Sequence, residues 1–133
     1  MKIHSPGSRP TRLGPADAFT GHVQLDPIIG EDPASLRANT VRFAPGARTF
    51  WHSHTLGQTL QVTAGAGYVC CRGEAAQEIR AGDTVWIPAD VEHWHGAGPT
   101  TAMTHLAIQA SPDGGETEWL DEVADADYPG AAG

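Results

Sequence analysis

Short apolar and polar runs alternate along most of this chain. In FTGHVQLDPI every second residue from Phe19 to Leu25 is apolar or glycine, a period of two that predicts a half-buried strand ending at Pro27. From Thr40 to Gln109 the pattern recurs in strand-sized pieces joined by turns with glycine or proline: TVRF, RTFWHSH, QTLQVTAG, AGYVCCRG, AQEIRAGD, TVWIP, EHWHGAG and TAMTHLAIQ. Because no long helical period separates them, the sequence predicts an all-β fold of antiparallel strands closed into a barrel or sandwich.

The two ends of the chain differ from this centre. Residues 1–18 are expected to form an irregular arm, and residues 19–112 to form the barrel. Residues 113–133 are an acidic tail, in which Trp119 and Leu120 predict one short amphipathic helix over Glu116–Val123 with a solvated acidic face. A chain of 133 residues has room for one core, so a single domain is expected.

Composition narrows the classes of function. A formal net charge of −8 argues against nucleic acid and anionic membranes, since both require basic patches. No apolar run approaches the roughly 20 residues of a membrane span, and the first residues lack the apolar region of a signal peptide. Cys70 and Cys71 are adjacent and so face opposite sides of a strand, which offers no disulfide framework. These features predict a cytoplasmic protein whose ligand is a small molecule.

Histidines cluster within the predicted strands. His52 and His54 share one face of a strand, about 6.6 Å apart at their Cα atoms, and imidazoles at that spacing can converge on one ion. Gln58 follows a tight corner and offers an amide oxygen, while His93 and His95 share a face of another strand. This cluster predicts a metal site rather than a set of hydrogen-bonded core histidines.

Imidazole and amide ligands are all neutral, so a divalent ion would keep its full charge. That favours Lewis-acid chemistry over redox cycling, because a carboxylate at position 58 would have stabilised a trivalent ion. Imidazole suits several first-row metals, so the ligands alone leave iron, nickel, zinc and manganese open.

The stretch MTHLAIQ places His105 and Gln109 on one face of its strand. If that face lines the barrel, His95 and His105 are histidines near the metal that could move a proton at neutral pH. A core histidine bonded to a backbone carbonyl is the alternative for His105, and a group that only orients a ligand is the alternative for His95.

Two stretches resemble the signatures of the cupin superfamily. GARTFWHSHTLGQTLQVTAG is similar to the first, with Gln58 in place of the usual glutamate. GDTVWIPADVEHWHG is similar to the second, with Gly82, Pro88 and His93 at the expected spacings. The resemblance implies a single-domain cupin, a jelly-roll barrel with the metal inside.

The resemblance extends to small bacterial manganese cupins with hydroxynitrile lyase activity, through GPADAFTGHVQLDP, FAPGARTFWHSHTLGQTLQVTAG and HWHGAGPTTAMTHLAIQ. It implies one manganese ion, ligands at His52, His54, Gln58 and His93, and a pocket lined by His95, His105 and Gln109. The implied reaction reversibly splits an aldehyde cyanohydrin into aldehyde and hydrogen cyanide. A metal-dependent dioxygenase, or a cupin that binds metal or ligand without catalysis, is the alternative.

A cyanohydrin lyase needs a base for the hydroxyl proton, and histidines whose lone pairs are on an ion cannot serve. We expect His105 to be that base, with His95 as the alternative and Gln109 steadying the leaving cyanide. Trp51 and Trp94 each neighbour an inward-facing histidine and so point out of the barrel. An outward indole requires covering, by the N-terminal arm or a second subunit, so a homodimer or homotetramer is expected.

Overall fold

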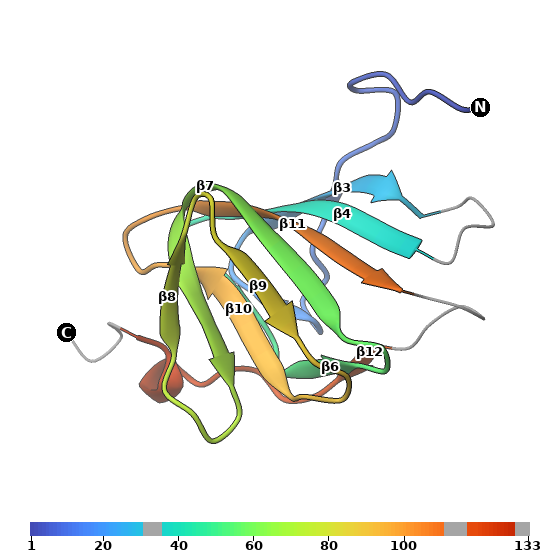
Figure 1. The fold of residues 1–133 in the computed structure, drawn as a ribbon. Coiled ribbons are helices and arrows are strands. Elements are labelled where there is room, and N and C mark those ends of the chain that lie inside the picture. The colour runs from blue at the N-terminus through green and yellow to red at the C-terminus, as the bar shows by residue number, and fades with distance from the viewer. Residues whose placement is uncertain (31–35, 111–116, 130–133) are drawn as a thin grey trace.

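The computed structural model describes residues 1–30, 36–110 and 117–129. These residues form antiparallel strands and one 3₁₀ turn, with no α-helix among them (Figure 1). The all-β barrel that the alternation predicts is confirmed. The strands are β1 (Arg12–Leu13), β2 (Phe19–Thr20), β3 (Val23–Ile29), β4 (Leu36–Phe43), β5 (Arg48–Thr49), β6 (His52–His54), β7 (Gln58–Cys71), β8 (Gln77–Arg80), β9 (Thr84–Ile87), β10 (His93–Ala97), β11 (Met103–Ala110) and β12 (Thr117–Trp119).

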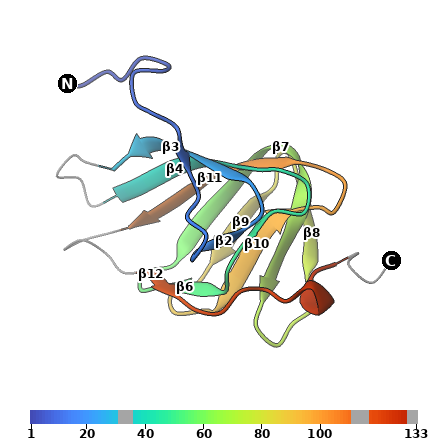
Figure 2. The same ribbon diagram turned by 180° about the vertical axis from the view of Figure 1, so that it is seen from behind.

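The strands form one strongly curled sheet in the order β1-β3-β4-β11-β7-β10-β5-β2. β8 and β9 pair with β7, and β6 pairs with β10 and β12. Figure 2 shows the other side, where β12 lies beside β6 at the bottom of the view and β2 lies above them. No helix in the described ranges is long and apolar enough to cross a membrane.

The long strand β7 joins the two walls of the barrel. Its first part pairs with β11 and β9, and its second part pairs with β10 and β8. The sequence predicts two strands here, but the structure has one strand bent at Gly65–Gly67. Gly65 has a φ of 73°, and a Cβ on Gly67 would overlap the carbonyl oxygen of Gly96. The glycines that suggested a turn therefore mark a corner within a continuous strand.

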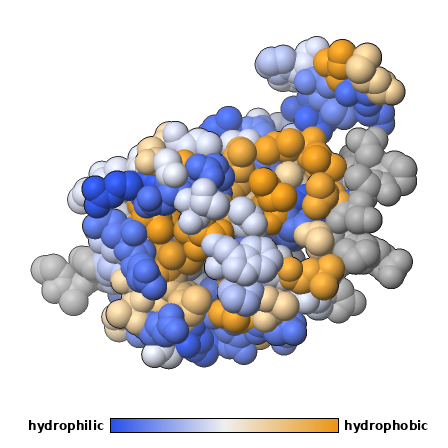
Figure 3. Space-filling view, viewed as in Figure 1, coloured by the Kyte–Doolittle hydropathy of each residue, from blue (hydrophilic) through white to orange (hydrophobic). Residues whose placement is uncertain are grey.

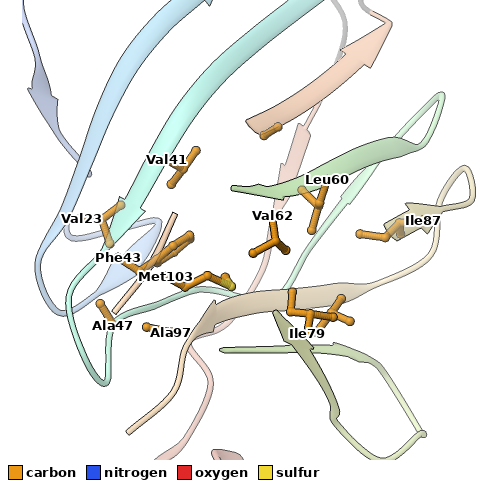
Figure 4. Close-up of a cluster of buried hydrophobic side chains, with 12 residues drawn as sticks. Val23, Val41, Phe43, Ala47, Leu60, Val62, Ile79, Ile87, Ala97 and Met103 are labelled. Carbon is orange, nitrogen blue, oxygen red and sulfur yellow. The ribbon is translucent and has the colours of Figure 1, made fainter. Parts of the chain in front are cut away.

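An apolar core fills the space between the walls (Figure 4). Val62 and Leu60 come from β7, and Phe43 and Met103 come from the neighbouring strands β4 and β11. Phe43 also contacts the rings of His95 and His105, at centroid distances of 6.0 and 5.3 Å. The histidines thus lie against the core, which holds their rings in place.

The C-terminal segment differs from its prediction. Instead of a helix over Glu116–Val123, residues Thr117–Trp119 form β12 and Asp125–Asp127 form a 3₁₀ turn, while Glu116 lies outside the described residues. β12 pairs with β6, with Trp119 opposite His52. The expectation of a helix is wrong because β12 pairs with β6 and gains backbone hydrogen bonds there, which an amphipathic pattern of about two turns could not predict.

The same segment covers the outward tryptophans. Trp51 and Trp94 pack with Val123 and Tyr128. The exposed fraction is 7% for Trp51 and 0% for Trp94. The expectation that the N-terminal arm or a second subunit covers them is therefore wrong. A different outward face is apolar: Figure 3 shows a hydrophobic area over β4 and β11, where Leu36 of β4 is 43% exposed. Trp86, on β9, is 61% exposed. Faces of this kind are typical of contacts between subunits, so a homodimer or homotetramer stays a prediction.

Arg48 ties the C-terminal segment to the barrel. Its side chain is buried, and Nη2 donates to the carbonyl oxygen of Val123 at 2.8 Å and to Asp125 Oδ1 at 2.7 Å. The guanidinium carbon lies 4.3 Å from the centre of the Tyr128 ring. The Tyr128 hydroxyl in turn donates to the carbonyl oxygen of Ala97 on β10.

We expect Arg48→Met to lower the free energy of unfolding by about 2–3 kcal/mol, since it removes charge-assisted hydrogen bonds from a buried position. Urea unfolding followed by tryptophan fluorescence measures this value. Arg80→Met is the control, because the exposed Arg80 side chain pairs with the surface carboxylate of Glu78, and it should change stability by less than about 0.5 kcal/mol. Equal destabilisation by the two variants would contradict the anchoring role.

Candidate metal centre

Three strands bring the chemically active side chains to the inner side of the barrel. His52 and His54 come from β6, His93 and His95 from β10, and Gln58 begins β7. His93 stands opposite His52 in the β10–β6 pair. These side chains are almost completely buried, with exposed fractions of 1%, 6%, 0%, 3% and 4% for His52, His54, His93, His95 and Gln58.

Backbone carbonyls fix the tautomers of two histidines. His52 Nδ1 lies 2.8 Å from the carbonyl oxygen of Phe50, and His93 Nδ1 lies 2.9 Å from that of Val91. A carbonyl only accepts, so each Nδ1 carries the proton and each Nε2 keeps a lone pair. Burial lowers the pKa of both rings below the ordinary value, which keeps them neutral. Both are thus prepared as metal ligands through Nε2.

The amide oxygen of Gln58 faces the Nε2 atom of His93. Gln58 Nε2 donates to Gln109 Oε1 at 2.9 Å, and this bond turns Oε1 of Gln58 toward His93 Nε2, 3.3 Å away. Because His93 holds its proton on Nδ1, two lone pairs meet here with no hydrogen between them. Adjacent ligands of one ion, with bonds of about 2.1 Å, lie about 3 Å apart, so a cation between these atoms fits the spacing.

His54 is the third imidazole of this group. Its Nδ1 lies 3.0 Å from the hydroxyl oxygen of Thr117, and its Nε2 is buried without a hydrogen-bond partner in the described residues. Burial, followed by the neighbouring His93, lowers the pKa of His54 to about 4. An unpartnered buried polar atom costs about 1–3 kcal/mol, which an ion would recover. The donor set His52, His54, Gln58 and His93 therefore fits a divalent metal.

His95 and His105 form a separate pair. His105 Nε2 lies 2.9 Å from His95 Nδ1, while His95 Nε2 and His105 Nδ1 have no partner among the described residues. Burial is the largest cause that lowers the pKa of both, to about 4 for His105 and well below the ordinary value for His95.

The ring nitrogens of His52, His93 and His95 lie within 4.8 Å of one another, so His95 competes with His54 for the third imidazole position. We favour His54 as the ligand, because the hydroxyl of Thr117 contacts its Nδ1 and leaves its buried Nε2 without a partner among the described residues. His95 instead meets another titratable ring, which suits proton transfer better than ligation.

A cavity of about 420 Å³ opens beside these side chains, a size that suits a small organic molecule. Trp119 closes part of it, with its ring 4.7 Å from His52 and 5.9 Å from Phe19. The lining residues include Phe19, Leu25, Val41, Thr49, His52, His54, Gln58, His95, Ala107, Gln109, Thr117 and Trp119.

The structure gathers all the expected site residues, but at different depths. His95 and Gln109 line the cavity, whereas His105 is fully buried one hydrogen bond behind His95. The sequence reasoning missed the place of Thr117 and Trp119 in the site, because it assigned Trp119 to the apolar side of a helix in the tail and gave Thr117 no role. The alternation of Thr117 and Trp119 around Glu118 is a strand signal, but too short to recognise without the partner β6.

Comparisons with known proteins show which family and which proteins this chain resembles. Residues 39–108 match the cupin domain family. An (R)-mandelonitrile lyase from Granulicella tundricola is 52% identical over 129 residues, covering 96% of this chain and 98% of that protein. A dimethylsulfoniopropionate lyase from Ruegeria pomeroyi is 31% identical over 111 residues, covering 73% and 72%. A cupin-like protein from Thermotoga maritima has a TM-score of 0.84 at 38% identity, covering 98% of this chain and 97% of its own.

We expect Thr117→Val to weaken manganese binding by about tenfold or more, because His54 would lose the hydroxyl that orients it. Titration of the metal-free protein against a chelator of known affinity measures the change. Thr117→Ser is the matched control and should bind manganese as the parent does. If Thr117→Val also binds like the parent, His54 is not a ligand held by Thr117.

Proposed function

This chain belongs to the cupin family, and we propose that it is a metal-dependent hydroxynitrile lyase that reversibly cleaves an aldehyde cyanohydrin into aldehyde and hydrogen cyanide. The supporting observation is the set of neutral, buried lone pairs beside a small cavity whose wall also carries His95. The 52% identity to a protein named (R)-mandelonitrile lyase supports this reaction over other cupin chemistries.

We propose one manganese ion held by His52, His54, Gln58 and His93, with iron, nickel or zinc as alternatives. A divalent ion among neutral ligands supplies Lewis acidity that makes the substrate hydroxyl easier to deprotonate. The remaining chemistry belongs to the side chains around the cavity.

The geometry favours His95 over His105 as the base. His95 lines the cavity and its Nε2 is unpartnered, whereas His105 is fully buried behind it. If His95 Nδ1–H donates to His105 Nε2, the lone pair of His95 Nε2 is directed to substrate. His105 then acts as a positioning residue that fixes the tautomer of His95. This order reverses the one expected from the sequence, which could not show that the two rings lie one behind the other.

The proton and electron balance is simple. His95 Nε2 accepts the hydroxyl proton, the oxygen–hydrogen electrons form the carbonyl bond, and the carbon–carbon bond breaks with its electrons on cyanide. His95 returns the proton to cyanide, so aldehyde and hydrogen cyanide leave and the enzyme is unchanged. Gln109 Oε1 accepts from Gln58, so the amide N–H groups of Gln109 are free to steady the leaving cyanide.

Metal removal tests the reaction itself. After treatment with a chelator, cyanide release from mandelonitrile should fall by more than about 10²-fold, since Lewis-acid stabilisation contributes several kcal/mol, and added manganese should restore it. Full activity without metal would disprove metal dependence. Oxygen consumption with a phenolic or diketone substrate, in place of cyanide release, would instead support the dioxygenase alternative.

Variants of the histidine pair test the assignment of roles. We expect His95→Ala to lose about 10²- to 10⁴-fold in kcat while it keeps its metal. His105→Ala should also lose activity, but His105→Gln should recover much of it, because an amide oxygen can still accept from His95 Nδ1–H.

Turnover numbers and metal content, measured on the same preparations, decide between the two bases. A base at His105 would leave His105→Gln as inactive as His105→Ala, and His95→Ala with near-parent activity.

A further inference from the structure

A second cavity, of about 460 Å³, opens beside the histidine cavity. Asn39 and Gln109 line both, so the two spaces share a wall. The N-terminal arm and the ends of β3 and β4 form the rest of it. Its lining residues are Lys2, His4, Arg9, Pro10, Arg12, Pro27, Ile29, Gly30, Arg37, Asn39 and Gln109.

The second cavity is cationic in an acidic protein. Lys2, Arg9, Arg12 and Arg37 are four of the eight lysines and arginines in a chain with sixteen aspartates and glutamates. Among the described residues, no aspartate or glutamate lines it. Half of the lysine and arginine side chains thus line one cavity, although the chain as a whole has twice as many acidic as basic residues.

Strand register directs two of these arginines toward the histidine cavity. Arg12 stands opposite Leu25 in the β1–β3 pair, and Arg37 stands opposite Gln109 in the β4–β11 pair. Residues opposite each other in a sheet share a face, and both Leu25 and Gln109 line the histidine cavity. Arg12 and Arg37 therefore belong to the concave face of the barrel.

Arg9 and Arg12 differ from the arginines elsewhere on the barrel. Arg42, Arg48, Arg72 and Arg80 each form an ion pair with a carboxylate, whereas in the described part of the chain Arg9 and Arg12 form none. Arg9 Nη1 donates to the carbonyl oxygen of Ile28 at 3.2 Å, which holds that side chain against β3. Guanidinium groups without a carboxylate partner can bind the oxygens of a carboxylate or a phosphate.

We propose that this second cavity binds the anionic group of the substrate, a carboxylate or a phosphate, carried on the end away from the reacting hydroxyl. The proposal rests on the lyase function proposed above and defines its substrate class: aldehyde cyanohydrins that bear an anion. Ala107 lines the histidine cavity, and Gln109, two residues further along β11 and about 7 Å away, lines both cavities, so a substrate with a ring between its hydroxyl and its anion has the matching length.

Calorimetric titration of the manganese-loaded protein with 4-formylbenzoate, benzaldehyde and inorganic phosphate tests this site. We expect 4-formylbenzoate to bind at least about tenfold more tightly than benzaldehyde. Arg9→Gln and Arg12→Gln should each lose about tenfold in 4-formylbenzoate affinity, as expected for one charge-assisted contact. Arg80→Gln, with the same change of charge on β8, should bind like the parent.

Phosphate affinity that falls in the same two variants, without tighter binding of 4-formylbenzoate, would assign the site to phosphate esters. Affinities unchanged by both arginine variants would overturn the proposal, as would equal binding of 4-formylbenzoate and benzaldehyde with no phosphate binding.

Cleavage of mandelonitrile and of its 4-carboxylate is then measured with the same protein preparations. The kcat/KM for the 4-carboxylate divided by that for mandelonitrile should be lower in the arginine variants than in the parent. Binding without any cyanide release would disprove the lyase and keep the anion site. Mandelonitrile cleavage with no anion binding, and with no preference for the 4-carboxylate, would disprove the anion site and keep the lyase function.

Discussion

Two hydrogen-bond acceptors, His93 Nε2 and Gln58 Oε1, face each other at 3.3 Å in the interior of this barrel. Such a contact is unfavourable unless a cation lies between the atoms, and hydrogen bonds direct the protons of the neighbouring side chains elsewhere. Backbone carbonyls hold the Nδ1 protons of His52 and His93, and Gln109 takes an amide proton of Gln58. The lone pairs that could hold an ion therefore depend on the acceptors behind the histidine and glutamine side chains.

The fold supplies those acceptors through a few long-range pairings. β6 lies between β10 and β12, so that one short strand meets His93 on one side and Thr117 on the other. β7 bends at Gly65–Gly67 and so belongs to both walls, with Gln58 at its beginning beside Gln109 on β11. Arg48 and the packing of Trp51 and Trp94 hold the C-terminal segment against the outside of the barrel. The anchoring of this segment is thus linked to the orientation of His54 inside.

The sequence predicts the parts of this site that depend on strand period. Alternation places His52 with His54 and His93 with His95, and it identifies the barrel without any knowledge of strand order. Alternation fails where pairing between distant segments determines the structure. Three residues of the acidic tail form a strand because they pair with β6. Alternation also cannot show that His105 lies behind His95, or that Arg12 and Arg37 share a concave face, because both depend on register between distant strands.

Diffraction from crystals of the manganese-loaded protein, recorded at the manganese absorption edge, tests the arrangement of lone pairs most directly. We expect one anomalous peak about 2.0–2.3 Å from the Nε2 atoms of His52, His54 and His93 and from Oε1 of Gln58, with Gln58 Nε2 still bonded to Gln109. A peak bound by His95 in place of His54, or one that Gln58 does not contact, would contradict this ligand set.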